Sequence, residues 1–214
     1  MMGTHWPTLV CLLATSGLTV AEFAGARRAQ SVLKPLAAGA FVTQALVAGA
    51  LGSLYGGAIL AALVLSALGD VLLLPRNRPF VFKMGMLAFG LAHGAFAIAF
   101  MLMDPTTGAG PVAPYAFAPA FALTVIAIVW LFPKVSKPDR FAIGLYSGVI
   151  AAMVWSALLL AGGALPWWVG LAALMFAVSD LFVARDRFVK ESPWNSVAIS
   201  PLYFGAQCLF ALSI

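Results

Sequence analysis

Charged residues are scarce in this sequence. Of its 214 residues only 9% are charged, whereas 63% are hydrophobic. Ordinary soluble domains carry roughly 25% charged residues, so the scarcity excludes a soluble domain and indicates an integral membrane protein. The net charge of +5 does not point to nucleic acid, because in a membrane protein the placement of basic residues matters more than their sum.

Cysteine and histidine are also rare, with two of each. Cys11 and Cys208 cannot supply a disulfide framework or a thiolate metal cage, and we expect them to be small buried hydrophobes. A three-histidine zinc site of the hydrolase type cannot be assembled from His5 and His93. The sequence also lacks a glycine-rich phosphate loop and a serine nucleophile elbow. It therefore predicts neither a metal site nor a cofactor.

Long apolar runs are what the sequence has in abundance. A spanning helix needs about 20 apolar residues to cross roughly 30 Å of hydrocarbon, and there the backbone must satisfy its own hydrogen bonds. We predict an all-α polytopic membrane helix bundle, a single integral membrane domain over residues 1–214. The first run lacks a basic leader before it and is expected to be a retained helix. About eight spans are predicted, approximately at 8–24, 36–54, 58–74, 80–103, 112–132, 140–162, 166–184 and 197–213.

Basic residues fall on one side of this predicted bundle. All twelve Lys and Arg residues lie in or beside the connections that follow the first, third, fifth and seventh spans. Short loops rich in Lys and Arg stay in the cytoplasm. The pattern predicts a multi-pass protein of the cell (inner) membrane with both termini on the non-cytoplasmic side.

Two aspartates interrupt the apolar runs, Asp70 in "SALGDVLLLPRNRPF" and Asp180 in "FAVSDLFVARDRF". They fall near the ends of the third and seventh predicted spans, so a four-plus-four division would make the halves parallel repeats. Each carboxyl then lies about one helical turn inside the cytoplasmic face. An aspartate costs about 2.5 kcal/mol or more at the bilayer centre and usually faces the bundle interior or a watery cavity. Two at one depth predict a shared site near the cytoplasmic face.

Other polar residues share the faces that would meet at this site. The candidates for binding or supporting a substrate are Ser66, Lys83, His93, Tyr146, Ser179, Tyr203, Gln207, Lys34 and Arg76. Structural interpretations stay open beside this one. A lone intramembrane Ser or Gln often ties helices together, and His93 is as well explained by packing. Either aspartate could instead form an ion pair with Lys83 or a nearby arginine, and Glu22 could pair with Arg27.

At these positions the sequence resembles the YhhN-like family of eight-span membrane proteins, which includes the mammalian lysoplasmalogenases. The resemblance is carried by Tyr146 and by the segments "LKPL" at 33–36, "SALGDVLLL" at 66–74, "GMLAFGLAHGAF" at 85–96, "FAVSD" at 176–180 and "LYFGAQ" at 202–207. Phe96 departs from the pattern, because the family is expected to have tyrosine there. The departure argues against a role for a hydroxyl at this position.

The resemblance implies hydrolysis of the vinyl ether bond of lysoplasmalogens to a fatty aldehyde and glycerophosphoethanolamine or glycerophosphocholine. One carboxylic acid would protonate the β-carbon, and burial beside a second carboxylate favours the protonated form. The other, ionised, would stabilise the cation and activate water, as in glycosidases. Asp70 and Asp180 are then the catalytic acid/base pair, with their individual roles open. Lys83, Arg76 or Arg78 would hold the lipid phosphate.

Two other function classes stay open beside the hydrolase. A small proton-coupled transporter also uses intramembrane carboxylates in parallel repeats, although a carrier needs a path to both faces and the polar residues here thin out toward the outer side. A membrane protein that binds lysolipid without catalysis is the third interpretation. The sequence leaves the oligomeric state open.

Overall fold

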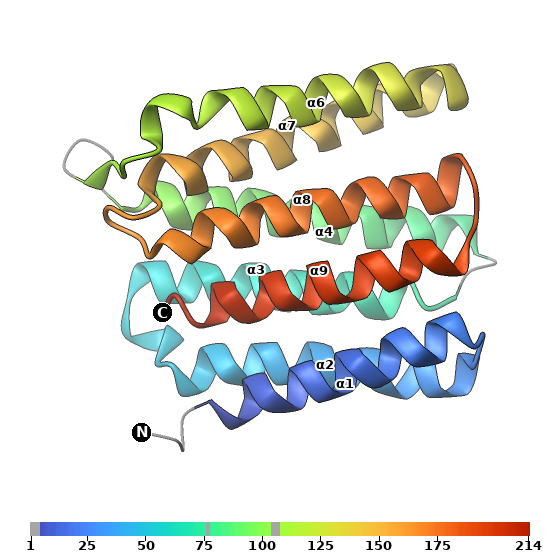
Figure 1. Ribbon diagram of the computed structural model, residues 1–214, viewed down its shortest axis with the longest axis horizontal. Helices are drawn as coiled ribbons and strands as arrows, with labels where there is room; N and C mark the ends of the chain where they lie inside the picture. Colours follow the sequence, from blue (N-terminus) through green and yellow to red (C-terminus); the bar gives the residue numbers. More distant parts are fainter. Residues whose placement is uncertain (1–4, 76–77, 104–107) are drawn as a thin grey trace.

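Helices make up almost all of the computed structural model, which describes residues 5–75, 78–103 and 108–214 (Figure 1). The long helices are α1 (Trp6–Phe23), α2 (Arg27–Val47), α3 (Leu54–Leu72), α4 (Pro79–Met101), α6 (Phe117–Leu131), α7 (Lys137–Leu160), α8 (Trp167–Phe188) and α9 (Pro193–Ala211). Short 3-10 turns form η2 (Ala50–Gly52), η3 (Ala113–Tyr115) and η4 (Phe132–Lys134). Within the described residues, β structure is limited to one isolated bridge, between Ala161 and Leu165. The predicted all-α class is confirmed.

Six helical segments in the described part of the chain are long and apolar enough to cross a membrane. They are Trp6–Phe23, Leu54–Leu72, Pro79–Met101, Ala113–Lys134, Asp139–Leu160 and Trp167–Phe188. The protein is thus a multi-pass membrane protein. Helices α2 and α9 are not among the six, because residues such as Lys34 and Gln44 in α2, and Asn195 and Gln207 in α9, lower their mean hydropathy. The predicted total of eight spans depends on these two helices.

Helix α2 differs at both ends from the predicted second span, 36–54. Helix α2 begins at Arg27, inside the segment predicted as a connection, and ends at Val47. Arg, Gln and Lys are good helix formers, and long cationic side chains reach water while their stems lie along apolar surface. The helix therefore continues past the hydrocarbon, with Pro35 inside it. The other long helices overlap their predicted ranges, with ends shifted by a few residues.

The connection between α2 and α3 is built by a glycine and a serine. Gly49 has a φ of 91°, a left-handed conformation that glycine adopts at no steric cost. Ser53 then caps α3 by accepting a hydrogen bond from the Gly56 N–H at 2.9 Å. Helix α3 consequently begins at Leu54, four residues before the predicted third span.

The long helices lie side by side, roughly along the longest axis of the molecule (Figure 1). Helices α1 and α2 pack together at one edge and α6 and α7 at the other. Between them, α3 packs against α4, and α8 against α9. Helix α9 also contacts α1, and α4 contacts α7. The beginning of α1 and the end of α9 are at the same end of the bundle. At the opposite end α3 and α8 finish, and these are the helices that carry the two aspartates.

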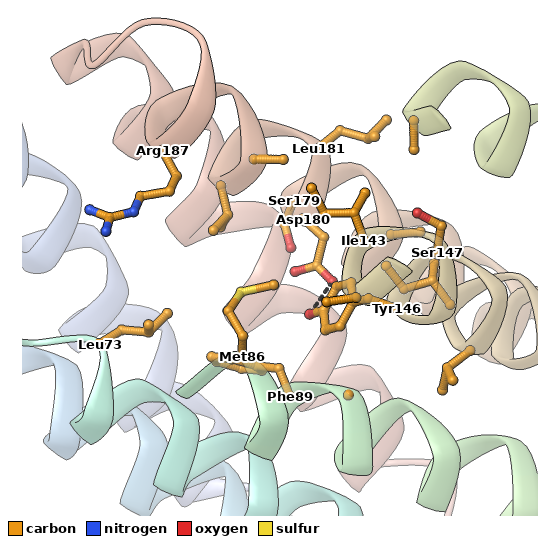
Figure 2. Close-up of a pocket in the computed structure, with 18 of the residues that line it drawn as sticks. Leu73, Met86, Phe89, Ile143, Tyr146, Ser147, Ser179, Asp180, Leu181 and Arg187 are labelled. Carbon is orange, nitrogen blue, oxygen red and sulfur yellow. Dashed lines mark hydrogen bonds between the residues drawn. The ribbon is translucent and has the colours of Figure 1, made fainter. Parts of the chain in front are cut away.

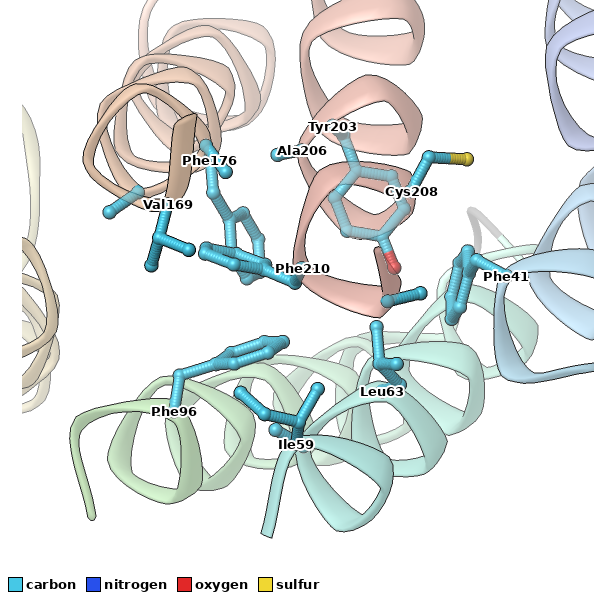
Figure 3. Close-up of a cluster of buried hydrophobic side chains, with 14 of the residues drawn as sticks. Phe41, Ile59, Leu63, Phe96, Val169, Phe176, Tyr203, Ala206, Cys208 and Phe210 are labelled. Carbon is cyan, nitrogen blue, oxygen red and sulfur yellow. The ribbon is translucent and has the colours of Figure 1, made fainter. Parts of the chain in front are cut away.

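A cluster of fully buried aromatic and aliphatic side chains joins α2, α3, α4, α8 and α9 (Figure 3). Its labelled members include Phe41, Ile59, Leu63, Phe96, Phe176 and Phe210. The rings of Phe96 and Phe210 are 4.3 Å apart between centroids, so the position where the family is expected to have tyrosine is filled by a packed ring. Because lipid is as apolar as these side chains, close packing rather than water exclusion holds membrane helices together. This cluster fixes the helices that position the aspartates.

Candidate active site

A cavity of about 590 Å³ lies near the end of the bundle at which α3 and α8 finish. Helices α4, α6, α7 and α8 form most of its wall, with residues of α2, α3 and α9 completing it. Asp70 and Asp180 both line this one cavity. The structure therefore brings the two predicted aspartates to a common space. Among the described residues no hydrogen bond or ion pair joins their carboxyl groups directly.

Asp70 lies in the last turn of α3 and is only 2% exposed. Its Oδ1 is 3.7 Å from the ammonium nitrogen of Lys34 on α2. Its Oδ2 accepts a hydrogen bond of 2.7 Å from the hydroxyl of Tyr203 on α9. One cation and one hydroxyl donor therefore face this carboxyl. Both donors stabilise its ionised form.

Asp180 lies two turns before the end of α8 and has different neighbours. The hydroxyl of Tyr146 on α7 donates a 3.0 Å hydrogen bond to its Oδ2 (Figure 2). The imidazole Nε2 of His93 is 3.2 Å from the same oxygen. The next residue back, Ser179, lines the cavity, and its hydroxyl donates to the Phe176 carbonyl. No Lys or Arg of the described residues forms an ion pair with Asp180.

His93 lies behind the cavity wall rather than in it. The ring is fully buried and stacks on Phe176 at 4.1 Å between centroids, with the Tyr146 ring edge-on at 5.6 Å. Its Nδ1 is 2.7 Å from the carbonyl oxygen of Phe89. Nε2 makes no aligned hydrogen bond, although Asp180 is close to it. Packing and a polar contact with Asp180 therefore both hold the His93 ring in place. The sequence had left packing and a role at the site as alternatives.

An aromatic group separates the surroundings of the two aspartates. Tyr203, the hydrogen-bond donor to Asp70, packs edge-on against Phe89 at 5.7 Å between centroids and at a tilt against Phe176 at 5.4 Å. Phe176 in turn stacks on His93. Gly69 allows Phe89 this position, because a Cβ at residue 69 would be 2.6 Å from the Phe89 ring. The two carboxyl groups thus share a cavity while each keeps its own set of partners.

The remaining predicted residues are distributed around this site. Lys34 and Lys83 line the cavity, and Lys83 forms an exposed ion pair with Asp139 at 3.8 Å. Ser66 and Gln207 are buried beneath it without hydrogen-bond partners for their side-chain polar atoms. Arg76 lies outside the described residues. The lysine beside Asp70 is thus Lys34 from α2, and not Lys83, which the sequence offered as an ion-pair partner.

Three charged side chains near the site were missed as site residues. Asp139 and Arg187 line the cavity, and the Arg187 guanidinium is 4.3 Å from the centre of the Phe82 ring. Arg187 follows Asp180 by two helical turns, so its place on the same face of α8 was readable from the sequence. Glu22 accepts a 2.6 Å hydrogen bond from Ser200, a contact between α1 and α9 that no local pattern signals.

Metal binding finds little support in this arrangement. Within residues 5–75, 78–103 and 108–214, no three His, Cys, Asp or Glu side chains gather closely enough to hold a metal ion. What the cavity offers instead is two carboxyls in unlike surroundings and hydroxyl donors, with an imidazole behind one of the carboxyls. These groups are suited to moving protons.

Known proteins named lysoplasmalogenase are similar to this chain. A bovine (Bos taurus) protein named lysoplasmalogenase TMEM86A is 33% identical over 161 residues, which are 72% of this chain and 64% of the relative. A pig (Sus scrofa) protein named lysoplasmalogenase TMEM86B is 31% identical over 164 residues, 76% of this chain and 66% of the relative. A Mycobacterium tuberculosis protein named lysoplasmalogenase is 32% identical over 152 residues, 69% of this chain and 56% of the relative. The chain therefore spans less than two thirds of the length of these relatives.

No solved structure matches this protein. The sequence model of the YhhN family, in contrast, matches residues 29–214. This range contains both aspartates and the partners described above, Lys34, His93, Tyr146 and Tyr203. With a match over most of its length, the chain belongs to the YhhN family.

Proposed function

We propose that the protein hydrolyses the vinyl ether bond of lysoplasmalogens, releasing a fatty aldehyde and glycerophosphoethanolamine or glycerophosphocholine. The observation that carries the proposal is that Asp70 and Asp180, from two different helices, line one cavity in a chain of otherwise apolar helices. The names of the relatives support the same chemistry for those proteins.

Vinyl ether hydrolysis needs an acid and a negative charge close together. Protonation of the β-carbon creates an oxocarbenium ion, water adds to it, and the resulting hemiacetal collapses to aldehyde and alcohol. A carboxylic acid supplies the proton, and a carboxylate stabilises the cation and accepts a proton from water. Asp70 and Asp180 are the two carboxyl groups that line the cavity near its hydroxyl donors. We assign them as the catalytic pair.

The cavity also has the features that a single-chain phospholipid requires. Apolar side chains from α4, α6 and α7 line it, among them Leu87, Leu91, Leu123, Ala127, Ile143 and Ile150. These would surround the alkenyl chain. Lys83 and Arg187 stand at the charged end of the same cavity, where they would hold the phosphate. Asp139, 3.8 Å from Lys83, places a negative charge where the ammonium of the headgroup would lie.

The basic connections support an orientation in which this charged end lies at the cytoplasmic headgroups. Lys134, Lys137 and Arg140 follow α6, and Arg185, Arg187 and Lys190 lie at the end of α8. These connections lie at the end of the bundle at which α3 and α8 finish (Figure 1), and the cavity is near this end. By the positive-inside rule this end faces the cytoplasm. The substrate is then drawn from the inner leaflet of the cell membrane.

Replacing each aspartate by asparagine tests the proposal. Asp70→Asn and Asp180→Asn keep the size of the side chain and remove the ionisable group. Each should lower aldehyde release from a lysoplasmalogen by at least about 10²-fold, because general acid–base groups contribute roughly that much or more. The assay uses purified protein in detergent and follows the aldehyde by mass spectrometry.

Asp186→Asn is the matched control. Asp186 is on the same helix as Asp180, but it accepts hydrogen bonds from Asn195 and Ser192 instead of lining the cavity. It should retain wild-type activity. Turnover in detergent distinguishes an enzyme from a carrier, which needs a sealed compartment, and product formation distinguishes it from a protein that only binds lysolipid. Wild-type rates in both Asp70→Asn and Asp180→Asn would overturn the proposed site.

A further inference from the structure

The position of the proton on His93 follows from a single contact. A carbonyl oxygen can only accept a hydrogen bond, and the Phe89 carbonyl is 2.7 Å from His93 Nδ1. Nδ1 must therefore carry a proton. The opposite assignment would place two lone pairs against each other in a fully buried environment. Turning the ring over would keep its stacking on Phe176 but would put Cδ2 in place of Nδ1 against the carbonyl oxygen, so the buried hydrogen bond would be lost.

This assignment decides what Nε2 presents to Asp180. In a neutral imidazole with its proton on Nδ1, Nε2 is an acceptor. It lies 3.2 Å from Asp180 Oδ2, which is also an acceptor when the carboxyl is ionised. Two acceptors at this distance repel one another, and the His93 side of the contact is fully buried. One additional proton between the two atoms replaces this repulsion with attraction, and a small rotation of either side chain would align the contact, which is not aligned as it stands, into a hydrogen bond.

Tyr146 does not remove this requirement. Its hydroxyl donates to the same Oδ2 at 3.0 Å, which satisfies one lone pair of that oxygen and leaves Nε2 facing the other. An oxygen that bears a proton can still accept the Tyr146 hydrogen bond. The described groups that can exchange a proton with His93 Nε2 are therefore Asp180 and, through it, Tyr146.

Asp70 has the opposite environment. The Lys34 ammonium lies 3.7 Å from its Oδ1, and Tyr203 donates to its Oδ2. The cation and the donor favour the ionised form of this carboxyl, against its burial and the nearby charge of Glu22. The two aspartates are thus unequal, one paired with a positive charge and one paired with an acceptor.

We propose that His93 Nε2 and Asp180 Oδ2 share one proton, that this proton is the one delivered to the vinyl ether, and that Asp70 is ionised when the substrate binds. This inference rests on the proposed function for the second of its three parts. His93 is a positioning residue here, because it holds the proton on Asp180 and does not touch the substrate.

The protons balance over one turnover. Asp180 gives its proton to the β-carbon as the double bond supplies the electron pair of the new C–H bond. Water then adds to the oxocarbenium carbon and loses a proton to Asp70. When the hemiacetal C–O bond breaks, that proton passes from Asp70 to the departing glycerol oxygen, and the hemiacetal hydroxyl returns its proton to Asp180 and His93.

Nitrogen-15 NMR of the histidines tests the shared proton without any substrate. The chain has only two histidines, so histidine-labelled protein gives two imidazole spin systems, and a His5→Gln variant assigns them. We expect His93 to show a protonated Nδ1 and an Nε2 resonance typical of a hydrogen-bonded nitrogen. Asp180→Asn should move the Nε2 resonance, whereas Asp70→Asn should leave it in place. Because the wild-type spectrum alone reports the tautomer, the test does not depend on a variant that folds.

A proton on Nε2 with a bare Nδ1, or an Nε2 resonance that does not respond to Asp180→Asn in a folded variant, would overturn the proposal. Activity supplies the second measurement. His93→Gln should lower kcat by about 10²-fold with little change in KM, and His5→Gln should match wild type. A His93→Gln variant that folds and keeps the wild-type kcat would show that His93 only packs. If wild-type protein releases no aldehyde, the proposed function fails, while the NMR result still decides whether the proton is shared.

Discussion

At the scale of single residues, the site is defined by which charge faces which carboxyl. Asp70 has the Lys34 ammonium at 3.7 Å, and Asp180 has an imidazole instead. Sequence spacing identified both aspartates, because each interrupts an apolar run. It could not identify their partners, since Lys34 and Asp70 are on different helices and Lys83 is much nearer to Asp70 along the chain. Ion-pair choice in a bundle depends on which helices pack together.

The Lys34–Asp70 pair predicts a specific loss of stability. Lys34→Met leaves a carboxylate that is 2% exposed without its cation. We expect this to reduce the free energy of unfolding by on the order of 2 kcal/mol, below the roughly 3–5 kcal/mol of a fully buried pair, because Lys34 is still 19% exposed. Thermal unfolding in detergent measures the change. The double variant with Asp70→Asn should recover much of the loss, and additive losses would contradict the pairing.

At the scale of secondary-structure elements, the sequence predicted helices better than it predicted their ends. Apolar runs mark what lies in hydrocarbon, whereas a helix ends where its backbone finds another partner. Arg27 at the start of α2 is polar and yet helical. Gly49 and Ser53 end one helix and begin the next through a left-handed turn and a side-chain cap. These local signals are present in the sequence, but a prediction of helix ends from hydropathy alone does not use them.

Neighbouring glycines in α3 test how tightly this turn is packed. A Cβ at Gly56 would be 2.5 Å from the backbone oxygen of Ala50, whereas a Cβ at Gly57 would meet nothing within 4 Å. We expect Gly56→Ala to destabilise the protein by about 1–3 kcal/mol, as overpacking does. Gly57→Ala should stabilise it by about 0.5–1 kcal/mol through helix propensity. Thermal unfolding of the two variants checks this, and equal effects would show that the turn yields easily.

At the scale of the whole molecule, one end of the bundle holds the cavity, both aspartates and the basic connections. The other end has the beginning of α1 and the end of α9. Charge asymmetry alone predicted which connections share a side. The cavity forms because α4, α7 and α8 pack around a space that the aromatic core does not fill. No local sequence pattern predicts where such a space will be.

Thiol labelling of intact cells tests the predicted orientation. The native Cys11 and Cys208 are buried and should not react, so single cysteines can be introduced at exposed positions. Leu51→Cys, between α2 and α3, should react with a membrane-impermeant reagent from outside. Ser136→Cys, between α6 and α7, should react only after the membrane is opened. The reverse pattern would place the cavity at the outer leaflet.

The sequence by itself determined the helical class, the membrane environment and the two carboxyls that stand out in it, because hydrocarbon enforces helices and makes every buried charge conspicuous. Only the tertiary structure decided that Lys34 faces Asp70, that His93 faces Asp180 and that one cavity contains both aspartates. Such contacts join residues on separate helices. Their geometry depends on how side chains such as Phe89, Phe176 and Tyr203 pack against one another. This packing cannot be predicted from local sequence patterns.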